Sequence, residues 1–389
     1  MRERLIDQLE QIKEAGNYRE IRYLRPVTAS RVQYNGREYL NLCSNSYLSL
    51  HLHPDVIRAA KESIDEYGAG TCSSRSVSGS IDLYGMLEDE VASFKGYEKA
   101  LIFSNGYLAN IGIIATLIDE RDVIFSDELN HSSIIDSTRL SGARKVIYRH
   151  LDVEDLTKKI EQEPADTKKF VITETVFSMD GDVAPLRELY ALKEKYGVHV
   201  IVDEAHGTGV FGAKGQGVEE MQGVSGLMDV QMGTFGKALG SFGAFALGDR
   251  VTIDYLVNRA RTFMYTTALP ASALAAASAA LRLVRESALF KTELWDNIAY
   301  MRQGLLDMGF DLKRSEGPIV PIVVGEDSKA VRMQRLLMEK GIFLQAIRPP
   351  TVAPGTSRLR LTVVRGLSQT DMDQALEALQ QTGQEVGLI

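Results

Sequence analysis

The sequence predicts an α/β fold: a mostly parallel central sheet with helices on both faces, followed by a smaller α+β domain. Between residues 100 and 203, short apolar runs alternate with longer helical stretches, which is typical of parallel strands joined by helices. After about residue 285 this rhythm changes to a mixture of helices and short strands. The chain has 389 residues, 44% of them hydrophobic and 25% charged, so it is long enough for two or three domains of ordinary soluble composition.

The composition also excludes several classes of partner and site. Lysine and arginine number 44 against 52 for aspartate and glutamate, and the formal charge of −8 repels polyanions, so we expect no nucleic-acid partner. The two cysteines, Cys43 and Cys72, are too few for a disulfide framework or a four-thiolate zinc site and favour a reducing, cytoplasmic location. The most apolar stretch, 266–284, is rich in alanine and carries Arg282, so we expect a buried helix there and no membrane span.

The predicted elements follow in chain order. Residues 1–22 carry leucine and isoleucine at helical spacing, without the basic-then-apolar layout of a signal peptide. In the middle of the chain we expect strands at 100–103, 123–126, 169–174, 199–203 and 230–233, and helices at 107–117, 132–141 and 185–196. The last third predicts helices at 293–308, 329–340 and 369–381 and strands at 319–324, 342–346 and 358–363.

These elements predict three parts of the chain. An N-terminal segment, 1–44, consists of a helix and short strands and packs with the small domain. The large α/β domain spans 45–285, and the small C-terminal α+β domain spans 286–389.

Polar residues follow the carboxyl ends of the predicted strands, where ligands gather in open α/β sheets. Lys237 is the sharpest of them, because glycines at 236 and 240 leave its amine unobstructed on a strand-end loop. A lysine so placed can form a Schiff base with a carbonyl ligand, although a solvated loop lysine has the same local pattern. A nucleotide P-loop is excluded, since Gln231 and Ala238 stand where that motif needs glycine and serine or threonine.

A second candidate group closes the apolar run 198–202. The carboxylate of Asp203 would lie at the sheet edge beneath a ligand, and a pyridinium nitrogen needs such a partner to act as an electron sink. His206 could donate to a ring oxygen of the same ligand. The same pentapeptide also fits an aspartate that caps a turn beside an unrelated histidine. A metal site is the weaker interpretation, because no third ligand lies at a customary spacing.

Two glycine-containing segments are candidates for phosphate binding. Residues 207–212 match the dinucleotide fingerprint, but further glycines follow, and they make a poor helix start where that fingerprint requires a helix N-terminus. At Gly106 and Tyr107 a strand-to-helix turn offers backbone N–H groups and a helix dipole to a single phosphate. His131 follows the next strand and could stack on an aromatic cofactor ring, or be an ordinary packed or surface histidine.

Near the C-terminus, Arg358 and Arg360 alternate with Leu359 and Leu361 in strand fashion. The guanidinium groups then share one face, where one of them can bind an amino-acid carboxylate through two parallel hydrogen bonds. A solvated edge-strand face is the equally weighted alternative.

Taken in order, these residues resemble the α-oxoamine synthase family of pyridoxal-phosphate (PLP) enzymes over essentially the whole chain. The motifs that carry the resemblance are Asn105-Gly106-Tyr107, Asn130-His131, 176–182, 203–207, 234–237 and the C-terminal arginine strand. The resemblance implies the fold type I architecture of aspartate aminotransferase, with PLP bound by the large domain. It also implies an obligate homodimer with active sites at the subunit interface.

The resemblance implies catalytic and cofactor-binding roles. Lys237 would carry PLP as a Schiff base, Asp203 would pair with the pyridine nitrogen, His206 with the ring hydroxyl, and His131 would stack on the ring. The remaining cofactor contacts would come from Gly106, Tyr107, Ser178, Thr234 and, from the neighbouring subunit, Thr267.

The resemblance also implies substrate contacts and a reaction. Arg360 matches the position that binds the substrate carboxylate, and Asn45 and Arg22 match substrate-contacting positions. The implied reaction condenses a small L-amino acid with an acyl thioester of coenzyme A or acyl carrier protein, releasing an α-aminoketone, CO2 and the thiol. Residues 346–355 are similar to the run in those members that join L-alanine to a pimeloyl thioester in biotin biosynthesis.

Several alternatives stay open at this point. Other members of the family use glycine or serine, or longer acyl-coenzyme A donors. A plain aminotransferase would share the fold and Lys237. A nicotinamide dehydrogenase and a non-catalytic binding protein are the competitors from other classes.

Overall fold

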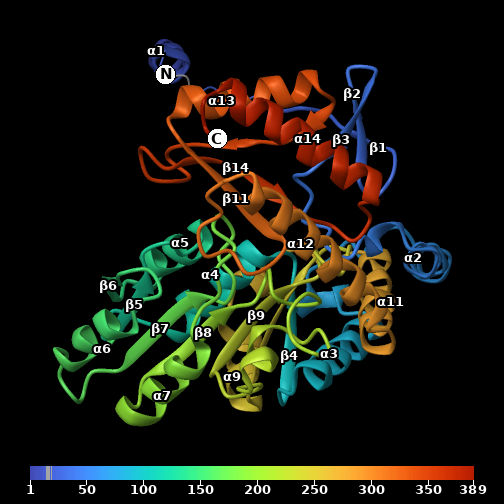
Figure 1. The fold of residues 1–389 in the computed structure, drawn as a ribbon. Helices are drawn as coiled ribbons and strands as arrows, with labels where there is room; N and C mark the ends of the chain where they lie inside the picture. Colours follow the sequence, from blue (N-terminus) through green and yellow to red (C-terminus); the bar gives the residue numbers. More distant parts are fainter. Residues whose placement is uncertain (15–17, 19) are drawn as a thin grey trace.

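The computed structural model describes residues 1–14, 18 and 20–389 of the chain. A seven-stranded sheet forms the centre of this part, in the order β4-β10-β9-β8-β7-β5-β6 (Figure 1). β10 pairs antiparallel with β4 and β9, and the remaining pairings are parallel. The strands are β4 (Lys99–Phe103), β5 (Val123–Asp127), β6 (Arg144–Tyr148), β7 (Lys169–Glu174), β8 (His199–Asp203), β9 (Val230–Thr234) and β10 (Ala244–Gly248). The mostly parallel α/β sheet predicted from the sequence is confirmed.

Both faces of this sheet are buried, which is why its strands carry continuous apolar runs. Val200 and Val202 pack into one hydrophobic cluster, and Ile201 between them packs into the other. The helices of this region are α2 (Pro54–Tyr67), α3 (Asp82–Lys95), α4 (Gly106–Leu117), α5 (Ser132–Ser141), α6 (Val153–Glu161), α7 (Leu186–Tyr196), α8 (Val218–Gln222), α9 (Arg250–Arg259), α10 (Arg261–Met264) and α11 (Ala271–Glu286), with short helical turns at Leu50–Leu52 and Arg75–Gly79.

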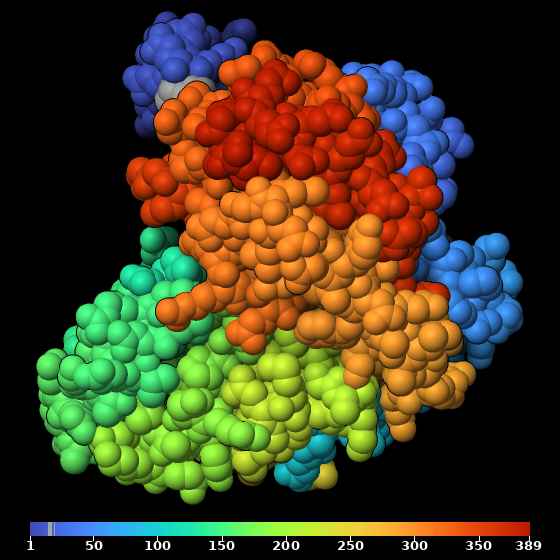
Figure 2. Space-filling view, viewed as in Figure 1, coloured from blue at the N-terminus to red at the C-terminus, as the bar shows by residue number. Residues whose placement is uncertain are grey.

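The C-terminal region carries two smaller sheets that lie above the large one in Figure 1. One has the order β11-β14-β13, and the other has the order β1-β2-β3-β12. Their strands are β1 (Arg25–Pro26), β2 (Arg31–Tyr34), β3 (Arg37–Asn41), β11 (Ile319–Gly325), β12 (Ile342–Phe343), β13 (Ala346–Ile347) and β14 (Ser357–Thr362). Because β12 pairs with β3, N-terminal and C-terminal segments share one sheet. Figure 2 shows these segments packed together over the large sheet region.

Three helices complete this region: α12 (Leu289–Asp307), α13 (Asp327–Glu339) and α14 (Gln369–Glu385). α14 begins with a capping box, in which Ser368 and Asp371 exchange hydrogen bonds with each other's backbone N–H groups. The Asp371 carboxylate also accepts a hydrogen bond of 2.6 Å from Arg31, which ties α14 to β2.

Several predicted boundaries were wrong. The helix expected over 1–22 is α1 (Arg2–Glu14); its apolar spacing runs only from Leu5 to Ile12, and residues 20–24 are not helical. Positions 15–17 and 19 of that prediction lie outside the described residues. The helix expected from 266 begins at Ala271, because Pro270 is extended and Ala268 donates its N–H to the Ser73 carbonyl.

Two further strand predictions were incomplete. The single strand expected at 342–346 is two short strands, β12 and β13, which join different sheets. β6 and β10 were not predicted: β6 is a mostly exposed edge strand with polar residues, and β10 is built largely from alanine and glycine. Across the described residues, no helix combines the length and the apolarity that crossing a membrane requires.

Candidate active site

The carboxyl ends of three neighbouring strands bring polar groups to one edge of the sheet. Glu174 ends β7, Asp203 ends β8 and Thr234 ends β9, and Glu174 and Asp203 are paired in register. The loop after β8 carries His206, and the loop after β9 carries Lys237. The parallel order of β7, β8 and β9 is therefore what gathers these residues, which are up to 63 positions apart in the chain (237 − 174).

A chain of hydrogen bonds leads from Lys237 into the interior. The Lys237 Nζ atom lies 2.8 Å from His206 Nε2, and His206 Nδ1 lies 2.6 Å from the Tyr47 hydroxyl. The Tyr47 hydroxyl donates in turn to Asn45 Oδ1 at 3.4 Å. A protonated lysine can only donate, so His206 accepts from Lys237 through Nε2 and, as a neutral ring, carries its proton on Nδ1 toward the Tyr47 hydroxyl.

The surroundings of these hydrogen-bonded side chains lower the pKa values of Lys237 and His206. Burial is the main cause for Lys237, whose pKa falls to about 8; nearby Arg360 lowers it further, while Asp203 and Glu174 oppose the change. Burial and the positive charges of Lys237 and Arg360 hold the pKa of His206 well below its usual range. Lys237 thus keeps a substantial neutral fraction near neutral pH, as a nucleophilic or basic amine requires.

The Asp203 carboxylate is held by two donors on opposite oxygens. Asn110 Nδ2 donates to Oδ2 at 2.9 Å, and the Ala205 N–H donates to Oδ1 at 2.9 Å. Asn110 projects from α4 and also donates to Ser133 Oγ, which lies 2.8 Å from His131 Nδ1. The α4 and α5 helices therefore fix the orientation of Asp203 and His131 together. Partial burial and Lys237 lower the pKa of His131, and Asp203 opposes that change.

Glu174 is a buried carboxyl beside Asp203 whose Oε1 atom has no hydrogen-bond partner among the described residues. Its carboxyl accepts the backbone N–H groups of His131 and Ser178. Burial and the neighbouring Asp203 raise the pKa of Glu174 to about 8, against the opposing charge of Lys237. A buried carboxyl with an unpartnered oxygen thus lies close enough to Lys237 for the two charges to affect each other's pKa.

Arg360 reaches the site from β14, the middle strand of the three-stranded sheet. Its Nε donates to the Ser178 carbonyl at 2.5 Å, and its Nη1 donates to Asn45 Oδ1 at 3.1 Å and to Thr362 Oγ1 at 3.0 Å. The solvated edge-strand alternative for the two arginines is wrong: β14 is the middle strand of its sheet, and the side chains of Arg358 and Arg360 are buried. Arg358 pairs with Asp180 at 2.5 Å, so Arg360 is the arginine of this face that lies beside Asn45.

The N-terminus of α4 has the geometry of an anion site. Asn105 caps the helix by accepting the Leu108 N–H at 3.0 Å, and the N–H groups of Gly106 and Tyr107 belong to the first turn, which has no intrahelical acceptors. The Tyr107 hydroxyl bonds to Asp136, and its ring meets His131 edge-on at 6.4 Å. The predicted strand-to-helix turn is confirmed.

Thr234 and Thr267, the two threonines predicted to contact the phosphate, have different surroundings in the structure. Thr234 Oγ1 donates to the Gly243 carbonyl at 2.8 Å and accepts the Gly236 N–H at 3.1 Å, so its proton is already engaged within the chain. Thr267 is exposed, and its carbonyl accepts a hydrogen bond from Ser104, next to the α4 turn of its own chain.

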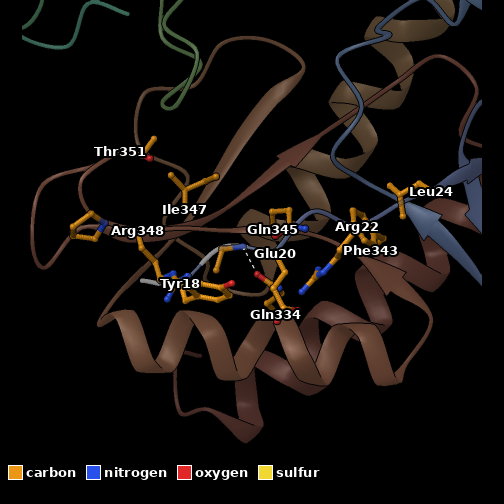
Figure 3. Close-up of a pocket in the computed structure, with 12 residues that line it drawn as sticks. Tyr18, Glu20, Arg22, Leu24, Gln334, Phe343, Gln345, Ile347, Arg348 and Thr351 are labelled. Carbon is orange, nitrogen blue, oxygen red and sulfur yellow. Dashed lines mark hydrogen bonds between the residues drawn. The ribbon is translucent and has the colours of Figure 1, made fainter. Parts of the chain in front are cut away.

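Other predicted features lie away from the lysine. Residues 207–217 form turns, and the next helix, α8, begins only at Val218, so the dinucleotide interpretation has no helix N-terminus there. Arg22 lies over the Phe343 ring at 5.7 Å and lines a pocket of about 590 Å³ with residues such as Gln334 and Arg348 (Figure 3). Burial raises the pKa of the nearby Cys43 thiol to about 12, and the charges of Arg360 and Arg22 oppose that change.

Sequence reasoning missed three residues of the site. Tyr47 lies two residues after Asn45, and Asn110 lies in the predicted helix 107–117, but their partners His206 and Asp203 are 159 and 93 positions away. Glu174 carried a usable signal, because it closes an apolar strand as Asp203 does. Tyr47 carried no such signal in the sequence, because its role follows only from its burial and from a hydrogen bond to a residue far away in the chain.

The donor set fits PLP. A carboxylate held by two donors suits a protonated pyridine nitrogen, a neutral amine suits an aldehyde, and a helix N-terminus suits one phosphate. The unpartnered Glu174 oxygen and the histidine pair supply further polar groups around a flat ring. Among the described residues, no cluster of three or more histidine, cysteine, aspartate or glutamate side chains has the arrangement of a metal site.

Comparison with known proteins agrees with this site. The family model for class I and II aminotransferases matches residues 37–379. The 8-amino-7-oxononanoate synthase of Geobacter sulfurreducens is 45% identical over 384 residues, covering 98% of each chain, and that of Exiguobacterium sibiricum is 38% identical, covering 100% of this chain and 99% of the relative.

Solved structures agree as well. A serine palmitoyltransferase from S. paucimobilis with bound PLP superposes with a TM-score of 0.94 at 32% identity, covering 99% of this chain and 98% of that one. The 8-amino-7-oxononanoate synthase of Francisella tularensis superposes with a TM-score of 0.77 at 29% identity, covering 89% and 98%. The chain belongs to the class I and II aminotransferase family of fold type I PLP enzymes and, within it, to the α-oxoamine synthases, which are PLP-dependent acyltransferases.

Proposed function

We propose that this chain catalyses the 8-amino-7-oxononanoate synthase reaction: L-alanine and a pimeloyl thioester condense to the α-aminoketone, with loss of CO2 and the free thiol. The observation that carries the proposal is the buried Lys237 amine, with a pKa of about 8, beside Asp203 and His206. The full-length likeness to relatives of that name supports the choice of substrates.

The residues of the site divide the work of binding and proton transfer. PLP, when bound through Lys237, supplies an electron sink for the α-carbon of the amino acid. Once the amino group of the substrate has displaced Lys237 from the cofactor, the freed Lys237 Nζ would be the base that takes the α-proton and later returns a proton to the product. His206 accepts a hydrogen bond from Nζ and so fixes its direction, and Tyr47 fixes the histidine.

The amino-acid substrate is bound on the side of the site formed by β14. Arg360 binds the carboxylate of the amino acid through its guanidinium, next to Asn45. Asp203, held by Asn110 and Ala205, presents its carboxyl to the ring nitrogen, and His131 covers the ring face. Gly106 and Tyr107 hold the phosphate through backbone N–H groups, with Ser178 beside the ring. Thr234 is a further phosphate contact, and Thr267 contacts the phosphate in the neighbouring subunit.

A thioester panel tests the proposed substrates. Purified holoenzyme is mixed with pimeloyl, shorter and longer acyl thioesters of coenzyme A and of acyl carrier protein, each with alanine, glycine or serine, and thiol release is measured. We expect release with pimeloyl thioester and alanine, in equal amount to CO2. Activity with serine or glycine and a different acyl chain would place the enzyme elsewhere among the α-oxoamine synthases. Keto-acid formation without thiol release would instead indicate an aminotransferase.

We also assign a homodimer to this chain, with the sites at its interface. Large apolar side chains are exposed around the α4 turn, including Val77 at 80%, Tyr265 at 69% and Phe242 at 55%. The Ser76 hydroxyl, next to Val77, donates to the Met264 carbonyl, next to Tyr265, and the Ser241 hydroxyl, next to Phe242, donates to the Ala273 carbonyl of α11. A monomer exposing such a patch beside its active site would be unusual, and a second copy covers it in this proposal.

Charge placed in this patch is expected to dissociate the dimer. Val77→Asp would bury a carboxylate against an apolar partner surface, so the dissociation constant should rise at least about 100-fold. Sedimentation velocity over a concentration series measures it. Val331→Asp, on α13 of the small domain, is the matched control and should leave the dimer intact. An unchanged dimer in Val77→Asp would contradict the assigned interface.

A further inference from the structure

The turn after β7 is held from two sides, and its inner side touches the predicted substrate-binding arginine. We name residues 176–183 the Asp180 turn. Val176 and Val183 form an isolated bridge, the Phe177 N–H donates to the Asp182 carbonyl at 3.0 Å, and the Gly181 N–H donates to the Phe177 carbonyl at 2.8 Å. These contacts make the Asp180 turn rigid, so fixing the position of Asp182 on one side also fixes the position of Ser178 on the other.

On its outer side, the Asp180 turn is bound by a histidine between two carboxylates. His150 Nε2 lies 2.8 Å from Asp182 Oδ2, and His150 Nδ1 lies 2.9 Å from Asp127 Oδ1. Ionised carboxylates only accept hydrogen bonds, so both ring nitrogens donate and the ring is an imidazolium. Burial opposes this charge, but the bonds to Asp127 and Asp182 outweigh it and raise the pKa of His150 to about 9. The ring also meets Phe177 edge-on at 4.4 Å.

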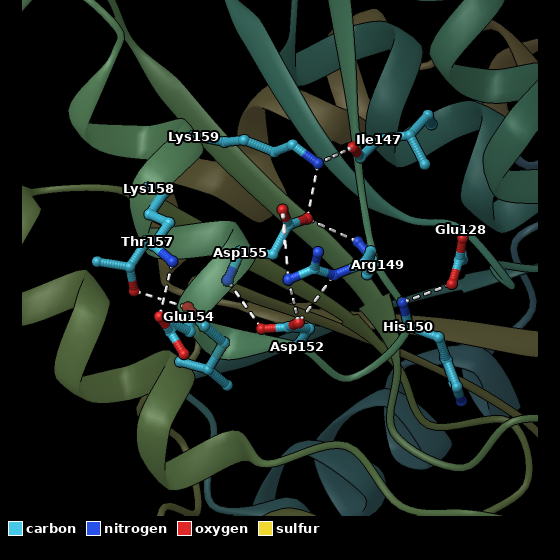
Figure 4. A network of polar contacts seen from close by, with 11 residues as sticks. Glu128, Ile147, Arg149, His150, Asp152, Glu154, Asp155, Thr157, Lys158 and Lys159 are labelled. Atoms are coloured by element: carbon cyan, nitrogen blue, oxygen red, sulfur yellow. Dashed lines mark hydrogen bonds and ion pairs between the residues drawn. The ribbon is translucent and has the colours of Figure 1, made fainter.

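The segment that carries His150 is itself anchored. The His150 N–H donates to Glu128 Oε1 at 2.8 Å, and the preceding Arg149 pairs with Asp152 at 2.6 Å at the start of α6. Figure 4 shows the His150 ring directed away from the Arg149 ion pairs. The imidazolium is thus presented to the Asp180 turn from a fixed backbone.

On its inner side, the Asp180 turn contacts the small-sheet region. The Ser178 carbonyl accepts from Arg360 Nε at 2.5 Å, and Asp180 pairs with Arg358 at 2.5 Å and Lys313 at 2.8 Å. A Cβ at Gly181 would lie 2.2 Å from the Ile319 carbonyl oxygen, so the two backbones touch there. The position of the Ser178 carbonyl, and with it the direction of the Arg360 guanidinium, depends on where this turn lies.

We propose that His150 is a positioning residue for Arg360: by joining Asp127 to Asp182 it fixes the Asp180 turn, whose Ser178 carbonyl orients the guanidinium for the amino-acid carboxylate. This inference rests on the proposed function, which assigns Arg360 to that carboxylate. His150 itself touches neither substrate nor cofactor. Its effect is therefore on amino-acid binding more than on the chemical step.

His150→Gln tests the proposal through amino-acid affinity. Titration of the holoenzyme with L-alanine, glycine and L-serine, followed by the absorption spectrum, is expected to give a dissociation constant about tenfold above wild type. KM for the amino acid should rise similarly, with kcat changed less than about threefold. Hydrogen exchange of the apo-protein should be faster in peptides covering 176–184. His199→Gln, an exposed histidine paired with Asp229, is the control and should change none of these.

The outcomes separate this proposal from the proposed function. If wild-type enzyme responds to none of the three amino acids, the proposed function is wrong. If wild type responds and His150→Gln binds them with equal affinity, the positioning role is wrong, even where the variant is less stable. Should His150→Gln not fold, Asp182→Asn, which keeps the ring and its bond to Asp127, is measured in the same way and should raise the dissociation constant about threefold.

Discussion

Replacing Lys237 by alanine is expected to reduce turnover by about 10³-fold or more, because the variant loses both the amine that binds the cofactor and the base of the proposed reaction. The Lys237 amine hydrogen-bonds to His206, and no other lysine is among the site residues described above, so none can take its place. Activity is measured as thiol release at saturating substrates. Borohydride treatment followed by mass spectrometry should fix the cofactor to residue 237 of the wild type and to no residue of the variant.

The same variant separates loss of chemistry from loss of the fold. The phosphate turn at Gly106 and the carboxylate of Asp203 are untouched, so Lys237→Ala should still bind PLP reversibly and melt close to the wild-type temperature. Lys340→Ala is the matched control and should retain full activity, because Lys340 is an exposed lysine at the end of α13 that bonds to Gln381. More than about a tenth of wild-type turnover in Lys237→Ala would contradict the assignment.

The positions of the candidate site residues were largely predictable from short stretches of sequence. Lys237 and Asp203 were identified because each follows an apolar strand and because the parallel order of β7, β8 and β9 places such positions at one edge. The helix turn at Gly106 was readable for the same reason, since a strand, an asparagine cap and a helix follow one another without a break. The order of strands, turns and helices along the sequence was therefore enough to predict those site residues that lie at the end of a strand.

The residues that hold those groups in place were not readable. Tyr47 reaches His206, Asn110 reaches Asp203, and His150 reaches Asp182, in each case across separate elements. Such pairs leave no period or spacing in the sequence, because only tertiary packing brings them together. The antiparallel strand β10 was missed for a related reason: its alanines and glycines are poor strand formers alone, and β4 and β9 on either side make it a strand.

Asp203→Asn is expected to reduce kcat/KM by about 10²–10³-fold, because it removes a preorganised negative charge while leaving the shape of the site intact. The amide can keep the contact with the Ala205 N–H, so the loop geometry should survive. The Asp203 charge raises the pKa of Lys237, and its loss should therefore lower that pKa further below about 8. In the wild type, Lys237 gives up its proton as the pH rises through its pKa; in the variant this change occurs at lower pH.

A pH series of the rate and of amine reactivity toward an acylating reagent in the apo-protein measures both effects of Asp203→Asn. The apo-protein arm reports on Lys237 without the cofactor, so it tests the electrostatic coupling independently of turnover. Asp229→Asn is the matched control, since Asp229 pairs with Lys193 and His199 at the opposite end of β8. A wild-type rate in Asp203→Asn would remove this carboxylate from the mechanism. An unshifted Lys237 titration would show that burial, Glu174 and Arg360 set the pKa of the amine without Asp203, and that Asp203 acts only on the ligand.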